Sequence, residues 1–337
     1  MKVAVLSFAH ASAATYVRLL RAMPGVDVVT ADPDGPPGDP ARGQSMAERL
    51  GAPYGGGWDE VFALRPDAVV VTSEIARRRE LVERAADVGA QVLCEHPLAP
   101  KETSAQAMVD ACADAGVRLT LASPACFSPA FSAVRRAIAD GDVVGELMTI
   151  HGTYHTPGRS ATQEPADGGA LAANAAFLLD MVDAVLGGEP AEQVYAQANS
   201  ILGGEPGVES AALVSVRYSS GTVAAVDCSW SLSANRPEEG GPTMTFVGDR
   251  GSVELNATPR LLSGFDGATA GEWWETGGPD VNSVMLSEFI AAVGKGHGAG
   301  PDGAAGVRTL RIIQAAYESV HTGRPVDLAV PQTSGRA

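Results

Sequence analysis

The sequence predicts an α/β protein, in which a doubly wound parallel sheet is followed by an α+β domain with an open, mostly antiparallel sheet. Two observations support this prediction. Up to residue 122, short apolar runs with the length of buried strands alternate with segments of helical periodicity. After residue 146, short strands of alternating polarity follow one another and are joined by hairpin-type turns. We therefore expect one domain at residues 1–122, a second at residues 123–330 and a C-terminal tail at residues 331–337.

The bulk composition narrows the class of protein and of partner. The 337 residues are 45% hydrophobic and 19% charged, which suits a globular protein with two cores. The formal net charge of −16 and the pI near 4.7 argue against nucleic acid or an anionic membrane as the partner. Polar residues interrupt the longest apolar stretch, residues 170–187, so no membrane-spanning helix is expected. A small molecule is the expected partner.

Cysteine usage and the first residues predict the compartment. The four cysteines have neither C-x-x-C nor zinc-binding spacing, which indicates reduced thiols, a cytoplasmic protein and no metal site. Residues 1–9 form a short apolar run with a single lysine, and the βα pattern that follows needs this run as its first strand. We therefore interpret it as a strand rather than a signal peptide.

The first 32 residues have the layout of a Rossmann dinucleotide-binding fingerprint. A strand is expected at Val3–Leu6, and a helix at Ala13–Met23 that ends before Pro-Gly. A second strand, Val26–Ala31, ends at Asp32, an acidic residue about twenty positions after the intervening loop. The pattern predicts that this loop lies against the phosphates of a dinucleotide.

The loop departs from the G-x-G-x-x-G pattern but keeps small residues at all three glycine positions. We expect its six residues to bind the cofactor: Ser7, Phe8, Ala9, His10, Ala11 and Ser12. Asp32 is expected to hold the adenosine ribose, and its charge favours NAD over NADP because it would repel a 2′-phosphate. The alternative is that Asp32 is an exposed turn residue before Pro33.

The rest of the first domain continues the strand–helix alternation. Thr72, Ser73 and Glu74 follow the third strand and are further expected cofactor contacts, as are Glu95 and His96 after the fourth strand. The helix at Arg77–Val88 is expected to bury its apolar residues and to direct its arginines outward. The expected elements are a loop at Gly35–Gly43, helices at Ser45–Leu50, Trp58–Leu64, Arg77–Val88 and Ser104–Ala115, and strands at Ala68–Val71, Gln91–Cys94 and Val117–Ala122.

Several motifs in this order resemble the Gfo/Idh/MocA family of oxidoreductases. The run D-A-V-V-V-T-S from residue 67 and V-L-C-E-H-P-L-A from residue 92 are similar to the family's D-A-V-x-I-A-T-P and V-L-x-E-K-P-L-A. Phe127-Ser128-Pro129 and Gly145-Glu146 resemble its F-x-P … G-x-x-G-x-I segment. The end of the chain, from Asp302-Gly303 to G-R-P-V at residues 323–326, resembles its closing pattern. The resemblance covers nearly the whole chain.

In the second domain, alternating strands surround one long helix. Strands are expected at Leu147–His155, Gln193–Asn199, Ala211–Tyr218, Thr222–Ser229, Thr243–Gly248 and Ser252–Leu255, and helices at Ala170–Leu186, Val284–Val293 and Gly306–Gly323. The resemblance implies a sheet with helices on one face and a dimer interface on the other. We therefore expect a homodimer or a higher homo-oligomer through this sheet.

The resemblance implies hydride transfer between a nicotinamide and a sugar, cyclitol or small polyol, with a lysine and a histidine handling the proton. Alcohol oxidation requires a base within hydrogen-bonding reach of the hydroxyl. The family's lysine position is His96 here, and imidazole titrates near neutrality, so His96 is the first catalytic candidate. The alternative is that His96 only orients the turn. The His96–Pro97 bond is expected to be cis.

The second expected proton carrier is absent from the helix at residues 170–186. The family's G-G-G-x-x-x-D-x-x-x-H pattern places its aspartate on Ala173 and its histidine on Phe177, neither of which transfers a proton. Asp180 is retained, and a structural role is expected for it. Asn174 offers an amide to a substrate or serves the scaffold.

Tyr154 and His155, on the strand at residues 147–155, are the candidate replacements. With His151 they are expected to face the substrate if side chains alternate, or else to be polar residues of an exposed strand. The leading hypothesis is thus an NAD(P)-dependent oxidoreductase with an altered acid/base set. The alternatives are a nucleotide-binding scaffold, sensor or partner subunit without turnover, and an enzyme that uses the cofactor for different chemistry.

Overall fold

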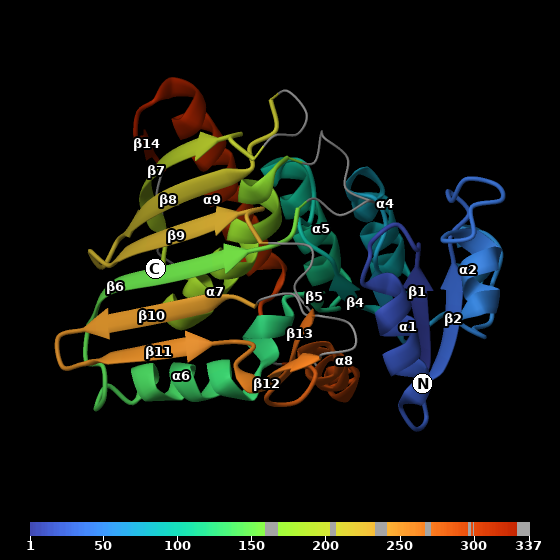
Figure 1. Cartoon of the computed structure of the whole chain (residues 1–337). Coiled ribbons are helices and arrows are strands. Elements are labelled where there is room, and N and C mark those ends of the chain that lie inside the picture. The colour runs from blue at the N-terminus through green and yellow to red at the C-terminus, as the bar shows by residue number, and fades with distance from the viewer. Residues whose placement is uncertain are drawn as a thin grey trace. The chain divides into compact units, whose positions relative to one another are not determined.

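The computed structural model describes residues 1–158, 168–202, 207–232, 241–266, 271–295, 298 and 300–328. The chain forms two compact units. Unit 1 contains Met1–Phe127 and Pro279–Val307, and unit 2 contains the described parts of residues 128–159, 168–278 and 308–337. Each unit is built around its own sheet (Figure 1). The expected tail at 331–337 lies outside the described residues.

The sheet of unit 1 is parallel, and its strands run in the order β2-β1-β3-β4-β5. Its strands are β1 (Lys2–Leu6), β2 (Asp27–Ala31), β3 (Ala68–Val71), β4 (Gln91–Cys94) and β5 (Leu119–Leu121). Nearly all their residues are buried, as expected when helices cover both faces of a parallel sheet. The predicted fold of the first domain is confirmed.

Helices connect these strands and close the core. They are α1 (Ala13–Ala22), α2 (Gly43–Arg49), α3 (Trp58–Ala63), α4 (Ile75–Asp87), α5 (Glu102–Asp114), the 3-10 turn η1 (Pro124–Phe127) and α8 (Val281–Ala292). Helix α1 buries Tyr16, Val17 and Leu20 along one face and contacts α8. Helix α9 (Gly303–Thr322) begins in unit 1 and ends in unit 2.

Parallel strands place the residues that follow them at one edge of the sheet. Ser7 follows β1, Asp32 follows β2, Thr72 follows β3 and Glu95 follows β4. Connections leave β1 on both sides, because β2 and β3 flank it in the sheet. This is the topological switch point at which open α/β sheets bind ligands.

The sheet of unit 2 has seven strands in the order β11-β10-β6-β9-β8-β7-β14. The strands are β6 (Leu147–His155), β7 (Ala191–Asn199), β8 (Ala211–Tyr218), β9 (Val223–Ser229), β10 (Thr243–Gly248), β11 (Ser252–Asn256) and β14 (Val326–Asp327). Only the β6–β9 pair is parallel among the described pairs of this sheet. The prediction of an open, mostly antiparallel sheet is confirmed.

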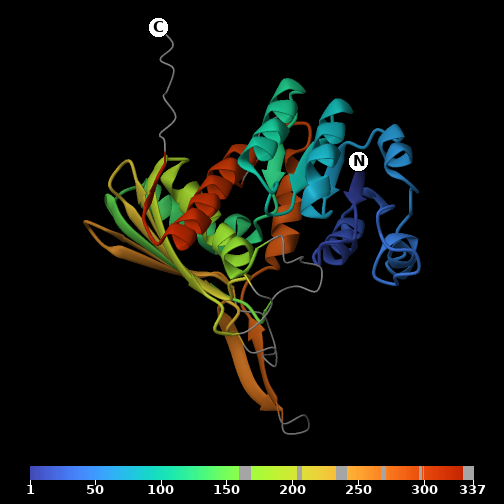
Figure 2. The ribbon, with the colours of Figure 1, turned by 90° about the horizontal axis from the view of Figure 1, so that it is seen from above.

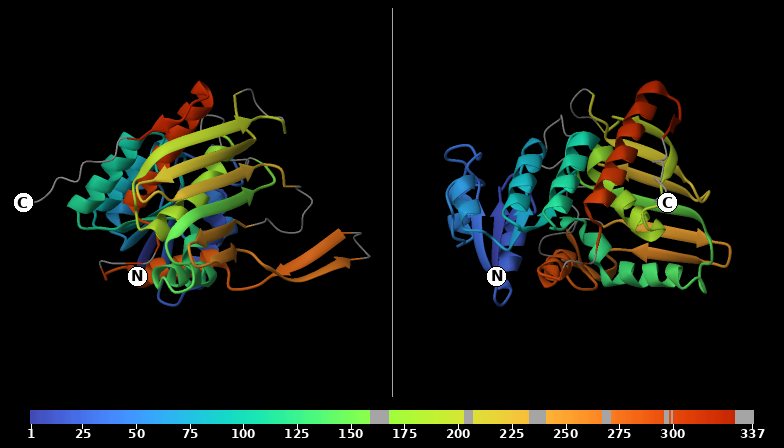
Figure 3. Two further views of the ribbon diagram at one scale, coloured as in Figure 1. Left: turned by 90° about the vertical axis from the view of Figure 1, so that its left-hand side faces the viewer. Right: turned by 180° about the vertical axis from the view of Figure 1, so that it is seen from behind.

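One face of this sheet carries helices and the other does not. Figures 2 and 3 show α6 (Pro129–Ala139), α7 (Ala176–Leu186) and the unit 2 part of α9 on the same face. Along β8 the even-numbered residues are buried against this layer, whereas Leu213 on the opposite face is 55% exposed. A separate hairpin of β12 (Arg260–Asp266) and β13 (Gly271–Thr276) projects from the unit (Figure 2); the sequence pattern did not predict it. None of the described helices is long and apolar enough to cross a membrane.

Candidate active site

The loop after β1 is held in place by its own small polar side chains. Ser7 stands at the first glycine position and adopts a left-handed backbone conformation, with φ of 79°. Such a conformation costs a non-glycine residue on the order of 1 kcal/mol or more. The Ser7 hydroxyl offsets this cost by accepting a hydrogen bond from the Ala9 N–H (3.1 Å) and by donating one to Asp32 (2.9 Å). The loop thus keeps its turn without the first glycine.

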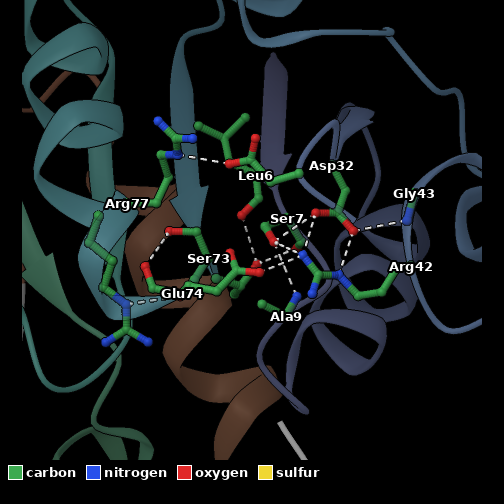
Figure 4. Close-up of polar contacts among 12 residues, drawn as sticks. Leu6, Ser7, Ala9, Asp32, Arg42, Gly43, Ser73, Glu74 and Arg77 are labelled. Carbon is green, nitrogen blue, oxygen red and sulfur yellow. Dashed lines mark hydrogen bonds and ion pairs between the residues drawn. The ribbon is translucent and has the colours of Figure 1, made fainter. Parts of the chain in front are cut away.

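Asp32 lies at the end of β2, and its carboxylate accepts four hydrogen bonds (Figure 4). Arg42 donates from Nε (2.8 Å) and Nη2 (2.9 Å), the Gly43 N–H donates at 2.8 Å, and Ser7 completes the set. Burial acts to raise the pKa of Asp32, but the hydrogen bonds from Arg42 and Gly43 lower it. The residue is 1% exposed, so the interpretation as an exposed turn residue is wrong.

Glu95 lies at the end of β4 and forms a second buried charged cluster. Its Oε1 lies 3.2 Å from Nδ1 of His10 and accepts a short hydrogen bond from the Ser12 hydroxyl. Burial would raise the pKa of Glu95, but the attraction of His10 and the hydrogen bonds from His10 and Ser12 hold it at about 2. This cluster joins the end of β4 to the loop in front of α1.

His96 follows Glu95 in a turn that is stabilised by hydrogen bonds from Arg78. The His96–Pro97 bond is cis, as predicted. Arg78 is 2% exposed and donates to three backbone carbonyls, those of Ser73 (3.1 Å), Glu95 (2.9 Å) and Pro97. The expectation that the arginines of this helix all point outward is therefore wrong. Burying Arg78 satisfies carbonyls that the irregular turn cannot pair within a sheet.

The residues after β3 divide into structural and accessible ones. The Thr72 hydroxyl donates to the Ser7 carbonyl (2.7 Å), and the Thr72 carbonyl accepts the His10 N–H (3.0 Å). These bonds attach the loop after β1 to β3. Ser73 is 1% exposed, whereas the Glu74 side chain is 41% exposed and accepts a hydrogen bond from Arg42 (2.7 Å). Glu74 is thus the one of these three residues whose side chain is accessible.

In unit 2, the expected catalytic helix begins with a π-helical segment, η3 (Leu171–Ala175), before α7. The segment carries Ala173, whereas Phe177 lies in the first turn of α7. Asn174 is 3% exposed, and its amide nitrogen donates to the Ser229 carbonyl (3.1 Å) and to the Thr156 hydroxyl (3.1 Å). We conclude that Asn174 serves the scaffold by tying η3 to the ends of β6 and β9.

Two anchors hold this helical segment in place. The Thr309 hydroxyl donates to the buried Asp180 carboxylate at 2.8 Å, which fits the structural role expected for Asp180. Glu209 accepts hydrogen bonds from the Leu171 N–H (2.9 Å) and from the Tyr317 hydroxyl (2.9 Å). Burial, and then the Glu209 charge, raise the pKa of Tyr317 well above its usual value.

The two replacement candidates on β6 point to opposite faces of the sheet. The ring of Tyr154 meets that of Phe177 edge to face at 6.0 Å, on the helix-covered side. His155 lies on the other side, where its Nδ1 is 2.7 Å from the Ser229 hydroxyl. His151 lies four residues before His155 in β6, so its side chain is on the same face of the sheet. The expectation that all three face one substrate is therefore wrong, and their catalytic roles stay predictions.

The residues at the edge of the unit 1 sheet suit a dinucleotide. Ala11 is exposed in front of α1, so its small side chain leaves the loop backbone open to a phosphate at the helix N-terminus. The structure brings eleven further predicted residues to this edge: Ser7, Phe8, Ala9, His10, Ser12, Asp32, Thr72, Ser73, Glu74, Glu95 and His96. His96 belongs to unit 1, and Tyr154 and His155 belong to unit 2.

Comparison with known proteins identifies the family of the chain. The description "Oxidoreductase family, NAD-binding Rossmann fold" matches residues 38–123, and "GFO/IDH/MocA C-terminal domain" matches residues 131–254. The chain belongs to the Gfo/Idh/MocA family. It is an oxidoreductase, because family relatives over most of its length are dehydrogenases and reductases. The resemblance stated from the sequence is confirmed.

The relatives and similar structures agree with this assignment. D-apiose dehydrogenase of Paraburkholderia graminis is 29% identical over 78% of this chain and 73% of the relative. Inositol 2-dehydrogenase of Rhizobium meliloti is 26% identical over 78% of this chain and 81% of the relative. The structure of GenD2 from gentamicin A biosynthesis, in complex with NAD, superimposes with a TM-score of 0.82 at 22% identity, covering 98% of this chain and 97% of that one. The last comparison shows a shared fold.

Sequence reasoning missed two arginines of unit 1. Arg42 lies in a segment interpreted only as a surface loop, and nothing in its spacing from Asp32 predicted their contact. Arg78 sits on a helix rich in arginine, and its signal was its position one turn from the buried Leu81 and Val82. Charged residues are seldom expected in a core, so the pattern alone favoured an outward side chain.

Proposed function

We propose that this oxidoreductase transfers a hydride between a nicotinamide dinucleotide and a carbinol carbon of a sugar, cyclitol or other polyol-like substrate. The observation that carries the proposal is the position of Glu95, His96 and cis-Pro97 beside the loop in front of α1. The names of the relatives, which include inositol, D-apiose and D-xylose dehydrogenases, support this substrate class.

His96 carries the proton in this proposal. When bound, the nicotinamide ring supplies the hydride acceptor. The neutral imidazole of His96 takes the proton of the substrate hydroxyl as the C–H bond gives up its hydride, and it returns that proton to solvent. The neighbouring Glu95 is committed to His10 and Ser12, so its charge fixes the turn rather than competing for the substrate proton. Either Tyr154 or His155 is proposed as an auxiliary group that holds or exchanges a proton, since the two lie on opposite faces of their sheet.

For the cofactor, we propose NAD, on the sequence argument that Asp32 ends β2. The full set of hydrogen bonds to Asp32 bears directly on this preference, because a ribose hydroxyl needs a carboxylate oxygen that can accept its proton.

We also propose that two copies associate through the uncovered face of the unit 2 sheet. On this face Val223, Thr149 and Val247 lie side by side across β9, β6 and β10. Val223 is 37% exposed, Val247 36% and Leu213 55%. Burying such residues against a second copy stabilises a dimer at roughly 25 cal/mol per Å². Light scattering tests this proposal, and the molar mass of a single chain would exclude it.

A second candidate function is nucleotide binding without turnover. The observation that favours it is that Ala173 and Phe177 are apolar, although the family pattern implies an aspartate and a histidine at these two positions of the helical segment. In that case the chain acts as a sensor or as a partner subunit. Turnover, and not cofactor binding, separates the two functions.

The deciding experiment titrates the protein with NADH and with NADPH and follows their fluorescence. We expect saturable binding with a dissociation constant in the micromolar range, about −8 kcal/mol. Reduction of NAD⁺ is then followed with inositol, D-apiose and D-xylose as substrates. His96→Ala is expected to lower kcat by about 100-fold or more, while His96→Lys retains part of it. His321→Ala, which removes an exposed imidazole from the end of α9, is the matched control.

Three results would contradict parts of the proposal. If neither nucleotide binds, the oxidoreductase proposal fails in both of its forms. If nucleotides bind but no polyol is oxidised, the second candidate function is favoured. If His96→Ala turns over as the wild type does, His96 is not the proton carrier.

A further inference from the structure

Arg42 bridges two strand ends across the loop that follows β1. It comes from the segment between β2 and α2, and its guanidinium lies between Asp32, after β2, and Glu74, after β3 (Figure 4). Its Nη2 is also 3.3 Å from the Ser7 hydroxyl, so the side chain passes over the turn that ends β1. Because β1 lies between β2 and β3, this arginine spans the switch point of the sheet.

We propose that Arg42, rather than Asp32, meets the 2′ position of the adenosine ribose and sets the choice between NAD and NADP. This inference rests on the proposed function, since it assigns a residue to the nucleotide site described above. It changes the expectation drawn from Asp32 alone, which is that a carboxylate at this position excludes a 2′-phosphate.

The carboxylate of Asp32 has no acceptor site left for a ribose hydroxyl. An ionised carboxylate has about four lone-pair sites, and Asp32 receives four donors, from Ser7, Gly43 and twice from Arg42. Its side chain is fully buried. A ribose hydroxyl can therefore reach Asp32 only by displacing one of these donors, and the bidentate Arg42 pair is the strongest kind among them.

Arg42 has a charged guanidinium group that can donate a further hydrogen bond. Its side chain is 13% exposed, and no hydrogen bond joins its Nη1 to any residue that the structure describes. Hydrogen bonding to Asp32 is the largest cause that raises the pKa of Arg42, so the guanidinium is charged at every physiological pH. A cation with a donor left over suits either a ribose oxygen or a 2′-phosphate.

The positive charge of Arg42 offsets the negative charges of Asp32 and Glu74 at this edge. Without Arg42, a 2′-phosphate at this edge would face the unneutralised carboxylates of Asp32 and Glu74. With Arg42, Asp32 is neutralised by a bidentate pair, and Glu74 is exposed enough (41%) to turn toward solvent. Arg42 therefore removes most of the repulsion that would otherwise select against NADP. NAD loses little, because its 2′-hydroxyl carries no charge.

The test compares dissociation constants for NADH and NADPH in the wild type, in Arg42→Ala and in Arg42→Lys. For the wild type we expect the two constants to lie within about tenfold of each other. In Arg42→Ala we expect the ratio to shift toward NADH by about tenfold or more, equivalent to about 1.4 kcal/mol. Arg42→Lys keeps the charge without the fork and should shift the ratio in the same direction by a smaller factor.

Arg77→Ala is the matched control. Arg77 is a partly exposed arginine three residues after Glu74, paired with Asp34 and Glu80, and it has no hydrogen bond to Asp32 among the described residues. We expect it to leave the ratio within about threefold of the wild type, which corresponds to less than 1 kcal/mol. A shift in the Arg42→Ala ratio of less than about tenfold, or toward NADPH, overturns the proposal. A wild type that binds neither nucleotide instead overturns the proposed function. Circular dichroism confirms that each variant is folded.

Discussion

The edge of the parallel sheet in unit 1 and the helical segment Leu171–Leu186 in unit 2 differ in the side chains at their expected functional positions. In unit 1 the charged side chains are kept and paired: Asp32 with Arg42, and Glu95 with His10. In unit 2 the expected aspartate and histidine are Ala173 and Phe177, and the amide of Asn174 is used on the scaffold. At these positions one region carries charged side chains and the other carries apolar ones, although the same helical segment also bears an ion pair of Asp183 with Arg308.

Because of this difference, cofactor binding and proton transfer can depend on different groups of the molecule. The groups that would hold a dinucleotide do not depend on the helical segment of unit 2, because each is fixed by contacts within unit 1. Cofactor binding can therefore be retained while the acid/base set changes. Proton-handling residues were expected at positions 96, 173 and 177, and only position 96 has a titratable side chain. The proposed chemistry therefore depends on a residue of unit 1.

The largest expected effect comes from the buried cation of unit 1. Arg78→Ala leaves the carbonyls of Ser73, Glu95 and Pro97 without their shared donor in a buried turn. We expect a loss of roughly 3–5 kcal/mol in the free energy of unfolding, measured by urea denaturation. Weaker NADH binding should accompany it, because the same turn presents His96.

Arg79→Ala is the control on the same helix. Arg79 is exposed and pairs with Glu83 at a separation of four residues, a contact worth roughly 0.3–0.5 kcal/mol. If Arg78→Ala cost no more than Arg79→Ala, the ionic groups of unit 1 would be as dispensable as surface pairs. The contrast between the two regions would then be lost.

Glu95 gives the next effect, and it depends on pH. Its folded pKa of about 2 lies below the ordinary 4.5, so its contribution to stability is fully present above pH 4.5 and is lost as the pH falls toward 2. The shift corresponds to about 3 kcal/mol, which is an order-of-magnitude figure. We expect Glu95→Gln to flatten the pH dependence of the unfolding free energy between about pH 4.5 and 2.

The exposed Glu254→Gln, on β11, should retain the wild-type slope in the same experiment. Equal slopes for Glu95→Gln and the wild type would show that the His10–Glu95–Ser12 cluster does not hold the carboxylate in its charged form. The charge of the cluster would then have no part in the stability of the turn.

The sequence predicted the sheet of unit 1 almost strand for strand, and for a physical reason. Runs such as Ala68–Val71 are apolar throughout, which is the pattern of a parallel strand buried on both faces. The order of the strands then placed Ser7, Asp32 and Glu95 at one edge without knowledge of any side-chain contact. Periodicity and topology were sufficient to bring these candidate residues together.

Contacts between distant side chains were not predictable in the same way. The pairing of Asp32 with Arg42 depends on the path of a loop, and loops carry no periodic signal. The separation of Tyr154 from His155 follows from strand alternation, which identifies two faces but does not by itself show that helices cover the Tyr154 side. The hairpin of β12 and β13 was missed although the sequence has an Asp-Gly dipeptide, which is typical of turns, at residues 266–267.

The smallest effect is expected in unit 2, at a polar group that serves the scaffold. Asn174→Ala removes the amide donor that joins η3 to Thr156 and to the Ser229 carbonyl. We expect a loss of roughly 1–3 kcal/mol in urea denaturation, because buried acceptors lose their partner but no buried charge is exposed. Gln197→Ala, at an exposed position of β7, is the control and should change stability by less than about 0.5 kcal/mol. NADH affinity should be unchanged in both variants, since every residue proposed to bind the dinucleotide lies in unit 1. A marked loss of NADH binding in Asn174→Ala would show that the helical segment of unit 2 takes part in holding the cofactor, and the separation of binding from proton transfer would have to be abandoned.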